Sequence, residues 1–344
     1  MAATTADIGY DAVLLVSFGG PEGPDDVMPF LENVTRGRGV PTERLEEVAQ
    51  HYQRRGGRSP INDHSRALLA ALREALVTDG LDLPVEWGNR NWRPYLSDAL
   101  QGLADRGASR VLAIATSAYS SYSSCRQYLE DIERARAEVG PRAPQVDKIR
   151  PFFNHPGFVD ALVDRVRDAL DDLPPERREQ AHLAFTAHSI PVSMAAACDY
   201  EEQLRETSSL VVEQLERPLP WELVWQSRSG PPQVPWLEPD IGDHLADLAG
   251  KGVDTVVMVP VGFVSDHMEV VHDLDTEATG RAGELGMEVR RAGTVGTHPR
   301  FVAALVELVR ERLEGATPVA MGRLPGRPHV CPPDCCPPPR RPGS

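Results

Sequence analysis

Short apolar runs alternate with longer amphipathic segments along most of the chain. Runs of strand length occupy residues 12–18, 84–88, 110–117, 146–151, 182–186, 222–226, 255–263 and 287–292. Segments with helical period lie at residues 25–33, 42–53, 63–78, 93–106, 126–139, 157–170, 199–216, 241–250 and 299–314. Strands that alternate with helices build βαβ units, so the pattern predicts an α/β protein with two parallel sheets flanked by helices.

The repeat of this pattern predicts two doubly wound domains. We assign residues 1–150 to the first and residues 151–297 to the second, and expect the last helix, about residues 298–315, to pack back on the first domain. Residues 316–344 are rich in Pro and Cys and lack apolar periodicity, which is typical of an extended or disordered tail. Ligands of doubly wound sheets bind outside the carboxyl ends of the strands, so we expect the site there.

Composition narrows the possible partners. The 344 residues carry a net charge of −15, which argues against nucleic acid or an anionic membrane as the main partner. No apolar run approaches the roughly 20 residues of a spanning helix, and the N-terminus lacks the features of a signal peptide. These observations predict a cytoplasmic protein without an integral membrane segment. The chain contains no GxGxxG or Walker A motif, so no nucleotide cofactor is expected.

An acidic segment follows the apolar run at residues 255–263. Ser265 and Asp266 offer N-cap chemistry, so a helix is expected to begin there. Glu269, Asp273 and Glu277 then fall at i, i+4 and i+8, on one face of that helix. This acidic row is either a solvated surface or a set of hard oxygen ligands for a divalent cation. Helical spacing turns His267 and His272 away from the row.

A second candidate element is the loop at residues 186–191, with the sequence TAHSIP. His188 follows a buried apolar strand there and precedes a rigid Pro191. It is either a hydrogen-bonded structural histidine or a functional group that faces Glu269 across the sheet edges. An imidazole in that position would serve as a base near neutral pH or as a ligand for a first-row metal.

Four stretches together resemble the ferrochelatase family. They are LLVSFGGP at residues 14–21, GGRSPI at 56–61, TAHSIP at 186–191 and VPVGFVSDHME at 259–269, and the resemblance runs from about residue 8 to 315. It implies a chelatase-like fold of two Rossmann-like domains, and a lyase that inserts Fe²⁺ into a porphyrin held in the cleft between them. Three further stretches, NVTRGRG, GNRNW and SRSGPPQVPWLEPD, are similar to actinobacterial members. That similarity implies coproporphyrin III as substrate and Fe-coproporphyrin III as product in haem biosynthesis.

The resemblance also implies roles for individual residues. His188 and Glu269 match the catalytic pair that handles pyrrole protons and the Fe²⁺ substrate, and Asp273 and Glu277 match an acidic ridge for metal or protons. The positions matched to porphyrin contacts are Ser59, Tyr128, Arg36 and Tyr52, with Arg38 as a second candidate in the loop of Arg36. Two positions depart from the pattern of some relatives: Phe18 replaces a tyrosine that can ligate the product iron, and Asn91 replaces a histidine.

The cysteines pose a separate question. Cys331, Cys335 and Cys336 crowd the tail, and a Cys₄ site needs one more thiolate. Relatives with a [2Fe–2S] cluster use one mid-chain and three C-terminal cysteines, which implies Cys125 as the fourth ligand and Cys198 as the reserve. Thiolates suit either an iron–sulfur cluster or zinc, and three unused cysteines are the remaining alternative.

Other functions stay open at this point. The chain could act on protoporphyrin IX, belong to the related cobalt or nickel chelatases, or carry porphyrin or haem without catalysis. The cobalt and nickel enzymes usually have a second histidine at the position of Glu269, and intact His188 and Glu269 argue against a carrier. A monomer is expected, with transient contacts to neighbouring haem-pathway enzymes.

Overall fold

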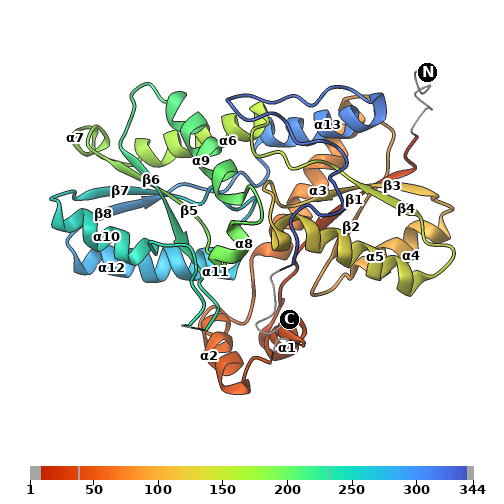
Figure 1. Ribbon diagram of the computed structural model, residues 1–344, viewed down its shortest axis with the longest axis horizontal. Helices are drawn as coiled ribbons and strands as arrows, with labels where there is room; N and C mark the ends of the chain where they lie inside the picture. The colour runs from red at the N-terminus through yellow and green to blue at the C-terminus, as the bar shows by residue number, and fades with distance from the viewer. Residues whose placement is uncertain (1–8, 38, 232, 339–344) are drawn as a thin grey trace.

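The protein is built on two parallel sheets that lie side by side. The computed structural model describes residues 9–37, 39–231 and 233–338, and within them each sheet has four strands (Figure 1). The first sheet has the order β2-β1-β3-β4, with β1 Ala12–Ser17, β2 Val85–Asn89, β3 Arg110–Ala115 and β4 Gln145–Lys148. The second has the order β6-β5-β7-β8, with β5 His182–His188, β6 Trp221–Gln226, β7 Thr255–Val259 and β8 Glu288–Arg291. The predicted α/β class with two parallel sheets is confirmed.

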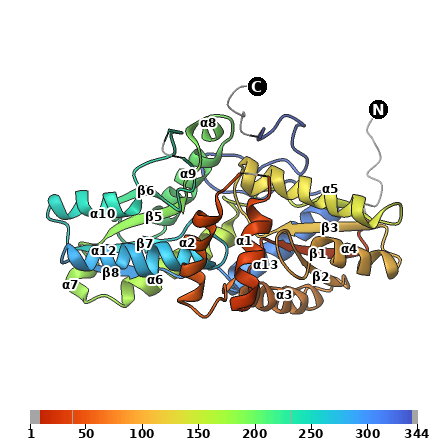
Figure 2. The ribbon, with the colours of Figure 1, turned by 90° about the horizontal axis from the view of Figure 1, so that it is seen from below.

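Helices cover both faces of each sheet (Figures 1 and 2). Those of the first half are α1 Val27–Thr35, α2 Thr42–Gln53, α3 Ile61–Thr78, α4 Leu96–Asp105 and α5 Gln127–Val139. Those of the second half are α6 Pro156–Asp171, α7 Pro175–Arg178, α8 Val192–Ala195, α9 Tyr200–Glu213, α10 Ile241–Gly250, α11 Met268–His272, α12 Thr279–Glu284 and α13 Pro299–Glu314. Short η turns, η1 Pro24–Asp26, η2 Tyr122–Arg126 and η3 Asp273–Ala278, complete the described elements.

The strands are buried on both faces because they alternate between two hydrophobic cores. In β1, Val13 and Leu15 join the large central core, whereas Leu14 and Val16 join the core beneath α4 and α5. This two-residue period is that of a parallel strand covered on both sides. A near-continuous apolar run is therefore the expected sequence of such a strand.

Helix α13 joins the two halves instead of packing on the first alone. It lies against α3 of the first half and α6 of the second. The central core correspondingly contains side chains from both sheets, among them Leu15 and Val257. The expectation for the last helix was therefore incomplete, and the division at residue 150 and the cleft between the halves stay predictions.

A buried ion pair attaches α13 and the tail to the first sheet. Arg150, just after β4, donates two hydrogen bonds of 2.8 Å to Glu311 of α13. Both side chains are almost wholly buried. Glu311 also accepts a 2.8 Å bond from the Val319 amide, and Arg150 donates to the Val319 carbonyl at 2.6 Å. Burial alone would raise the pKa of Glu311, but the bonds from Arg150 and Val319 hold it below its usual value.

The tail is extended and tied to the body over the residues that the structure describes. Its backbone meets the body at Met321, whose amide donates to the Asn154 carbonyl at 3.0 Å. Arg327 binds Asp199 at 2.6 Å, and Arg126 donates to the Pro333 carbonyl at 2.7 Å. The tail was predicted to be extended or disordered, and up to residue 338 the structure shows an extended chain. None of the described helices is long and apolar enough to span a membrane.

Glu311→Gln is expected to lower the free energy of unfolding by about 3–5 kcal/mol, because it leaves the Arg150 guanidinium buried without its counter-charge. Urea unfolding measures the loss. Glu314→Gln on the same helix is the control, since Glu314 forms an exposed pair with Arg310 and should change stability by no more than about 1 kcal/mol. Equal losses in the two variants would contradict the role given to the buried pair.

A buried histidine pair predicts acid sensitivity. His182 of β5 and His244 of α10 are both buried, with 3.3 Å between their Nε2 atoms. Burial, and then the charges of His244 and Lys251, lowers the pKa of His182 to about 4. Between about pH 6.5 and about pH 4, His182 is therefore protonated in the unfolded chain and neutral in the folded chain. The free energy of unfolding should fall as the pH drops through this range. His182→Gln should weaken this dependence in urea unfolding at several pH values; an unchanged slope would contradict the assignment.

Candidate functional site

His188 is positioned by the end of β5, in the middle of the second sheet. It pairs in register with Gln226 of β6, and the Ser189 amide donates to the Gln226 carbonyl at 2.8 Å. Tyr200 donates its hydroxyl hydrogen to the His188 carbonyl at 3.2 Å. The imidazole Nδ1 lies 2.5 Å from the Ser189 carbonyl oxygen, which can only accept. Nδ1 therefore carries a hydrogen, and Nε2, which holds the lone pair whenever the ring is neutral, is the nitrogen nearest Glu269.

Glu269 follows β7, the strand next to β5, and faces that lone pair. It lies in the first turn of α11, and 3.8 Å separates its Oε2 from His188 Nε2. The two side chains are 52% and 31% exposed, so both atoms are open to a bound molecule. His267 Nδ1 lies 3.9 Å from the same Glu269 oxygen. Burial lowers the pKa of His267, so that ring is neutral at physiological pH.

The loop between β7 and α11 depends on a glycine. Gly262 donates its amide hydrogen to the Thr186 carbonyl at 3.1 Å. A Cβ atom at Gly262 would lie 2.7 Å from the Ala187 Cβ, closer than carbon atoms approach one another. A side chain here would push the loop away from β5, so glycine is what lets Glu269 approach His188.

The helix predicted from Ser265 or Asp266 begins later, at Met268. The reason is that Asp266 does not cap a helix: its carboxylate binds Arg291 of β8 at 2.9 Å and accepts a bond from Thr294 at 3.2 Å. His267 occupies the N-cap position without a side-chain capping bond. This part of the prediction was wrong.

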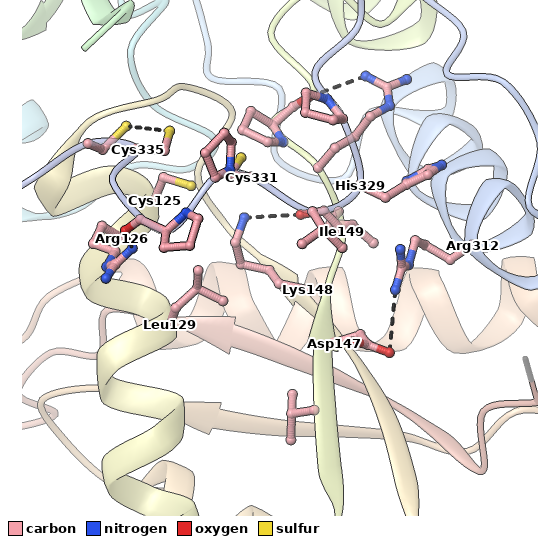
Figure 3. Close-up of a pocket in the computed structure, with 18 residues that line it drawn as sticks. Cys125, Arg126, Leu129, Asp147, Lys148, Ile149, Arg312, His329, Cys331 and Cys335 are labelled. Atoms are coloured by element: carbon pink, nitrogen blue, oxygen red, sulfur yellow. Dashed lines mark hydrogen bonds and ion pairs between the residues drawn. The ribbon is translucent and has the colours of Figure 1, made fainter. Parts of the chain in front are cut away.

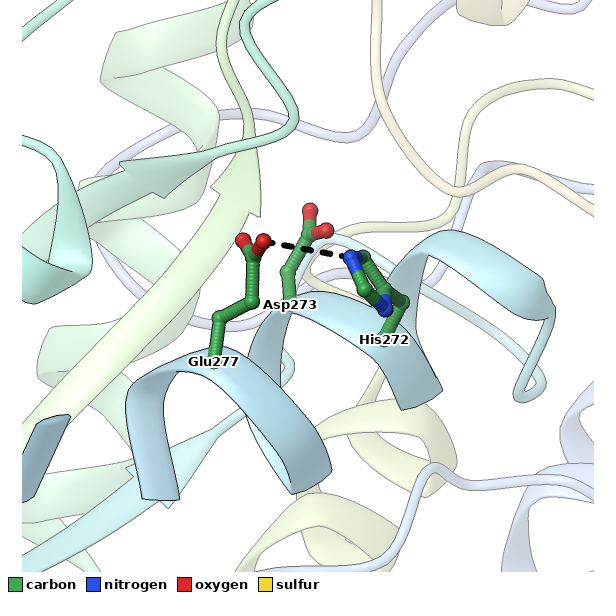
Figure 4. A group of neighbouring side chains, drawn as sticks. All are labelled: His272, Asp273 and Glu277. Atoms are coloured by element: carbon green, nitrogen blue, oxygen red, sulfur yellow. Dashed lines mark hydrogen bonds and ion pairs between the residues drawn. The ribbon is translucent and has the colours of Figure 1, made fainter. Parts of the chain in front are cut away.

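The helix is also not a regular α-helix. Its middle is a π-helical turn, η3, in which the Thr279 amide bonds the Leu274 carbonyl five residues earlier. In an α-helix, residues five apart point about 140° away from each other, whereas a π turn stacks them. His272 Nε2 accordingly lies 3.1 Å from Glu277 Oε1, and Figure 4 shows the two side chains beside Asp273. The expectation that His267 and His272 face away from the acidic row was therefore wrong, since His267 also lies 3.9 Å from Glu269.

Asp273 is the buried member of the acidic row. It accepts hydrogen bonds from Ser227 Oγ and, at 3.3 Å, from Gln226 Nε2, both at the end of β6. Burial raises the pKa of Asp273 to about 7; the charges of Glu269 and Glu277 add to this rise, and the Ser227 bond opposes it. Asp273 can therefore take up and release a proton near neutral pH. Asp273 and Glu277 also line a pocket with Asp240, Arg228 and Arg281.

The residues matched to porphyrin contacts lie around the first sheet. Ser59 is buried, and its amide donates to the Pro21 carbonyl at 2.9 Å. Tyr128 is buried beneath the Arg90 guanidinium, 4.4 Å from the ring centre. Arg90 is itself buried and paired with Asp131.

The other two candidates lie on the α1–α2 hairpin. Tyr52 is buried against Phe30, and burial followed by the negative charge of Glu269 raises the pKa of its phenol. Arg36 is exposed where α1 ends. Arg38 lies outside the described residues. Phe18 packs edge-on against Phe30, with 6.3 Å between ring centres.

Four cysteines line one cavity between the tail and the first sheet (Figure 3). Cys125 comes from η2, and Cys331, Cys335 and Cys336 come from the tail. The Cys335 and Cys336 sulfur atoms are 3.5 Å apart, and all five cysteines are free thiols. Burial, and then the charge of Cys335, raises the pKa of Cys331. Cys198 is not among the cavity's lining residues, and its thiol donates to the Met194 carbonyl at 3.2 Å.

Some residues at the site were not predicted from the sequence. Ser227 opens the SRSGPPQVPWLEPD stretch, but its contact with Asp273 is shown only by the fold. His51 stacks on His272 with 3.8 Å between ring centres, although 221 positions separate them in the chain. The sequence signal for the contact between His272 and Glu277 is their spacing of five residues, and this spacing predicts a contact only in a π turn.

Comparison with known proteins shows similarity to one family over most of the chain. The sequence profile of the ferrochelatase family matches residues 10–313. A protein of Streptomyces coelicolor named coproporphyrin III ferrochelatase is 54% identical, over 95% of this chain and 93% of that protein. One of the same name from Nocardia farcinica is also 54% identical, over 98% of this chain and 99% of that protein.

Solved structures share the fold. SirB from Bacillus subtilis with Fe³⁺ superposes with a TM-score of 0.55 at 14% identity, covering 89% of this chain and 98% of that one. The family match extends over most of the chain and includes the stretches that carry His188 and Glu269. The chain therefore belongs to the ferrochelatase family.

Proposed function

We propose that the protein inserts Fe²⁺ into coproporphyrin III, giving Fe-coproporphyrin III for haem synthesis. The observation that carries the reaction is the opposed pair at the strand ends, His188 Nε2 and Glu269 Oε2, 3.8 Å apart. The choice of porphyrin is supported by relatives named coproporphyrin III ferrochelatase that are 50–54% identical over nearly the full chain.

His188 is the proposed proton acceptor. Metallation requires two pyrrole N–H protons to leave the ring, and the bond from Nδ1 to Ser189 reserves Nε2 as the base. A positioned base of this kind contributes roughly 10²–10⁴-fold to the rate. Glu269 supplies a carboxylate that either stabilises the resulting imidazolium or ligates the incoming Fe²⁺ beside it. Because both groups are partly exposed, a flat macrocycle can reach them.

Asp273 is proposed to accept those protons and to pass them to solvent. Its pKa near 7 matches a group that accepts a proton and returns it to solvent at neutral pH. Glu277 follows it toward the pocket that also contains Asp240 and Arg281. We assign the acidic ridge of Asp273 and Glu277 to proton or metal traffic between that pocket and Glu269.

Residues in the first half of the molecule are proposed to bind the porphyrin carboxylates. Arg36 is the cation of the proposed set, since a guanidinium matches a carboxylate with two parallel hydrogen bonds. Ser59 and Tyr128 offer hydroxyl donors. Tyr52, in α2 of the α1–α2 hairpin, lies near Glu269. The Arg90–Asp131 pair beneath Tyr128 would hold that ring in place.

A [2Fe–2S] cluster is proposed for the cysteine cavity. The donor set fits: one helix-turn thiol and three tail thiols line the same cavity, and thiolates are the usual ligands of such clusters. Cys125, Cys331, Cys335 and Cys336 would hold it, with Cys198 as the reserve. When bound, the cluster would supply a covalent link between the tail and η2. Arg327, 3.8 Å from the Cys335 sulfur, would balance part of the thiolate charge.

His188→Ala is expected to lower kcat for Fe²⁺ insertion by at least about 100-fold while the affinity for coproporphyrin III changes little. Anaerobic loss of porphyrin fluorescence measures the rate, and equilibrium quenching measures binding. His64→Gln, a histidine of α3 in the first half, is the control and should keep the parent rate. A parent-like rate in His188→Ala would refute the assignment of the base.

Protein purified without oxygen is expected to show the visible absorption of thiolate-bound iron, with about two iron atoms per chain. Cys125→Ser should lose this chromophore, whereas Cys198→Ser should retain it. Colourless protein that contains one zinc per chain would reject the cluster in favour of a zinc site. Loss of colour in Cys198→Ser alone would transfer the fourth ligand to Cys198.

A further inference from the structure

The cavity that contains the cysteines also has a basic end, formed by Lys148, Arg312 and His329. Figure 3 shows the labelled cysteines on one side of the cavity and Arg312 and His329 on the other, with Lys148 between them. Lys148 belongs to β4, Arg312 to α13 and His329 to the tail, so segments far apart in the chain meet here. The whole cavity measures about 170 Å³, roughly ten times the space that one water molecule needs. It therefore has room for a small ion.

Positive charge exceeds negative charge at the basic end. Among the described residues that line the cavity, Asp147 is the one carboxylate. Two guanidinium groups share it, because Arg110 donates to it at 2.7 Å and Arg312 lies 3.4 Å from it. The Lys148 ammonium donates to the carbonyl of the next residue at 3.0 Å and forms no ion pair with the described residues. Three cations thus face one carboxylate, a surplus of two positive charges in a chain whose net charge is −15.

Two buried nitrogen atoms at the basic end lack a hydrogen-bond partner among the described residues. One is Nε of Arg312, a side chain that is 9% exposed, and this nitrogen can only donate. The other is Nδ1 of His329. His329 Nε2 lies 3.3 Å from the Ala316 carbonyl oxygen, which can only accept, so Nε2 carries the hydrogen and Nδ1 of the neutral ring is an acceptor. Since buried polar groups are nearly always paired, a ligand with both acceptor and donor atoms is expected here.

Hydrogenphosphate has this combination of charge and hydrogen-bonding groups. Its charge of about −2 matches the surplus, and its oxygens accept from Arg312 Nε and from the Lys148 ammonium. Its one P–OH hydrogen is available for His329 Nδ1. Sulfate has a similar charge and shape but no hydrogen to donate at neutral pH. Arg150, which also lines the cavity, is already neutralised by Glu311 and adds nothing to the surplus.

We infer that the basic end of this cavity is a binding site for inorganic phosphate, held by Lys148, Arg312 and His329. The bound ion connects β4 and α13 of the folded body with the tail. The site is separate from the His188–Glu269 pair, so it binds phosphate whether or not the protein inserts iron.

The sequence offers a direct test, because Lys148 and Lys251 are the two lysines of the chain. Lys251 forms an exposed pair with Asp247 at the end of α10, so it serves as an internal control. In full-length protein labelled with ¹³C at the lysine Cε atoms, Lys148→Arg and Lys251→Arg assign the two signals. Phosphate added at constant ionic strength should shift the Lys148 signal along a saturable curve and leave the Lys251 signal in place. Sulfate should need a higher concentration for the same shift.

Three outcomes of this titration would overturn the site. They are equal shifts of both lysine signals, no shift of the Lys148 signal, and a Lys148 signal that responds to iron bound by the cysteines but not to phosphate. In the last case the lysine would balance the charge of a cluster instead of binding an anion. Turnover plays no part in the readout, so failure of the site is distinguishable from failure of the proposed reaction.

Matched variants assign the residues of the site by calorimetric titration with phosphate and with sulfate. Lys148→Gln should weaken phosphate binding by at least about tenfold, because it removes a charged donor, whereas Lys251→Gln should keep the parent affinity. His329→Phe removes the acceptor, so it should abolish the preference for phosphate over sulfate while both still bind. Parent-like phosphate affinity in Lys148→Gln, or a preference that survives in His329→Phe, would overturn the assignment.

Discussion

Parallel strands deliver all their carboxyl ends to one edge of a sheet, and the placement of this protein's chemistry depends on that constraint. β5 lies between β6 and β7, so the residues that follow these three strands are necessarily neighbours. His188 ends β5, Gln226 ends β6 and is followed by Ser227, and Glu269 follows β7. Residues up to 81 positions apart thereby share one site, held by backbone hydrogen bonds of the ladder and by Gly262 at its tightest contact.

The π turn adds to that arrangement what an α-helix would not. It keeps Asp273 against β6 and brings His272 to Glu277, so an imidazole and two carboxylates lie on one side of the helix. π turns are rare inside helices and are frequently found at functional sites. Here the turn is also where α2 of the first half reaches the second half. The acidic row is thus shaped by both halves of the molecule.

The sequence predicts the sheets well because buried parallel strands are near-continuous apolar runs, and all eight runs are strands in the described structure. Helices such as α2, α10 and α13 begin and end at the predicted residues, since their caps and periods are local. The π turn could not be foreseen from an α-helical period, which is why His272 was misplaced. The side chain of Asp266 was misjudged because its partner, Arg291, is distant in the chain. His188 and Glu269 came from the family resemblance as much as from their strand ends.

The central claim is that the paired His188 and Glu269 serve iron insertion into coproporphyrin III. The most direct measurement offers Fe²⁺ without oxygen to coproporphyrin III and protoporphyrin IX in parallel, and follows the loss of porphyrin fluorescence. We expect turnover of coproporphyrin III with a kcat/KM well above that for protoporphyrin IX. Preference for protoporphyrin IX would contradict the proposed substrate. Tight binding of both porphyrins without turnover of either would contradict the reaction itself and indicate a carrier.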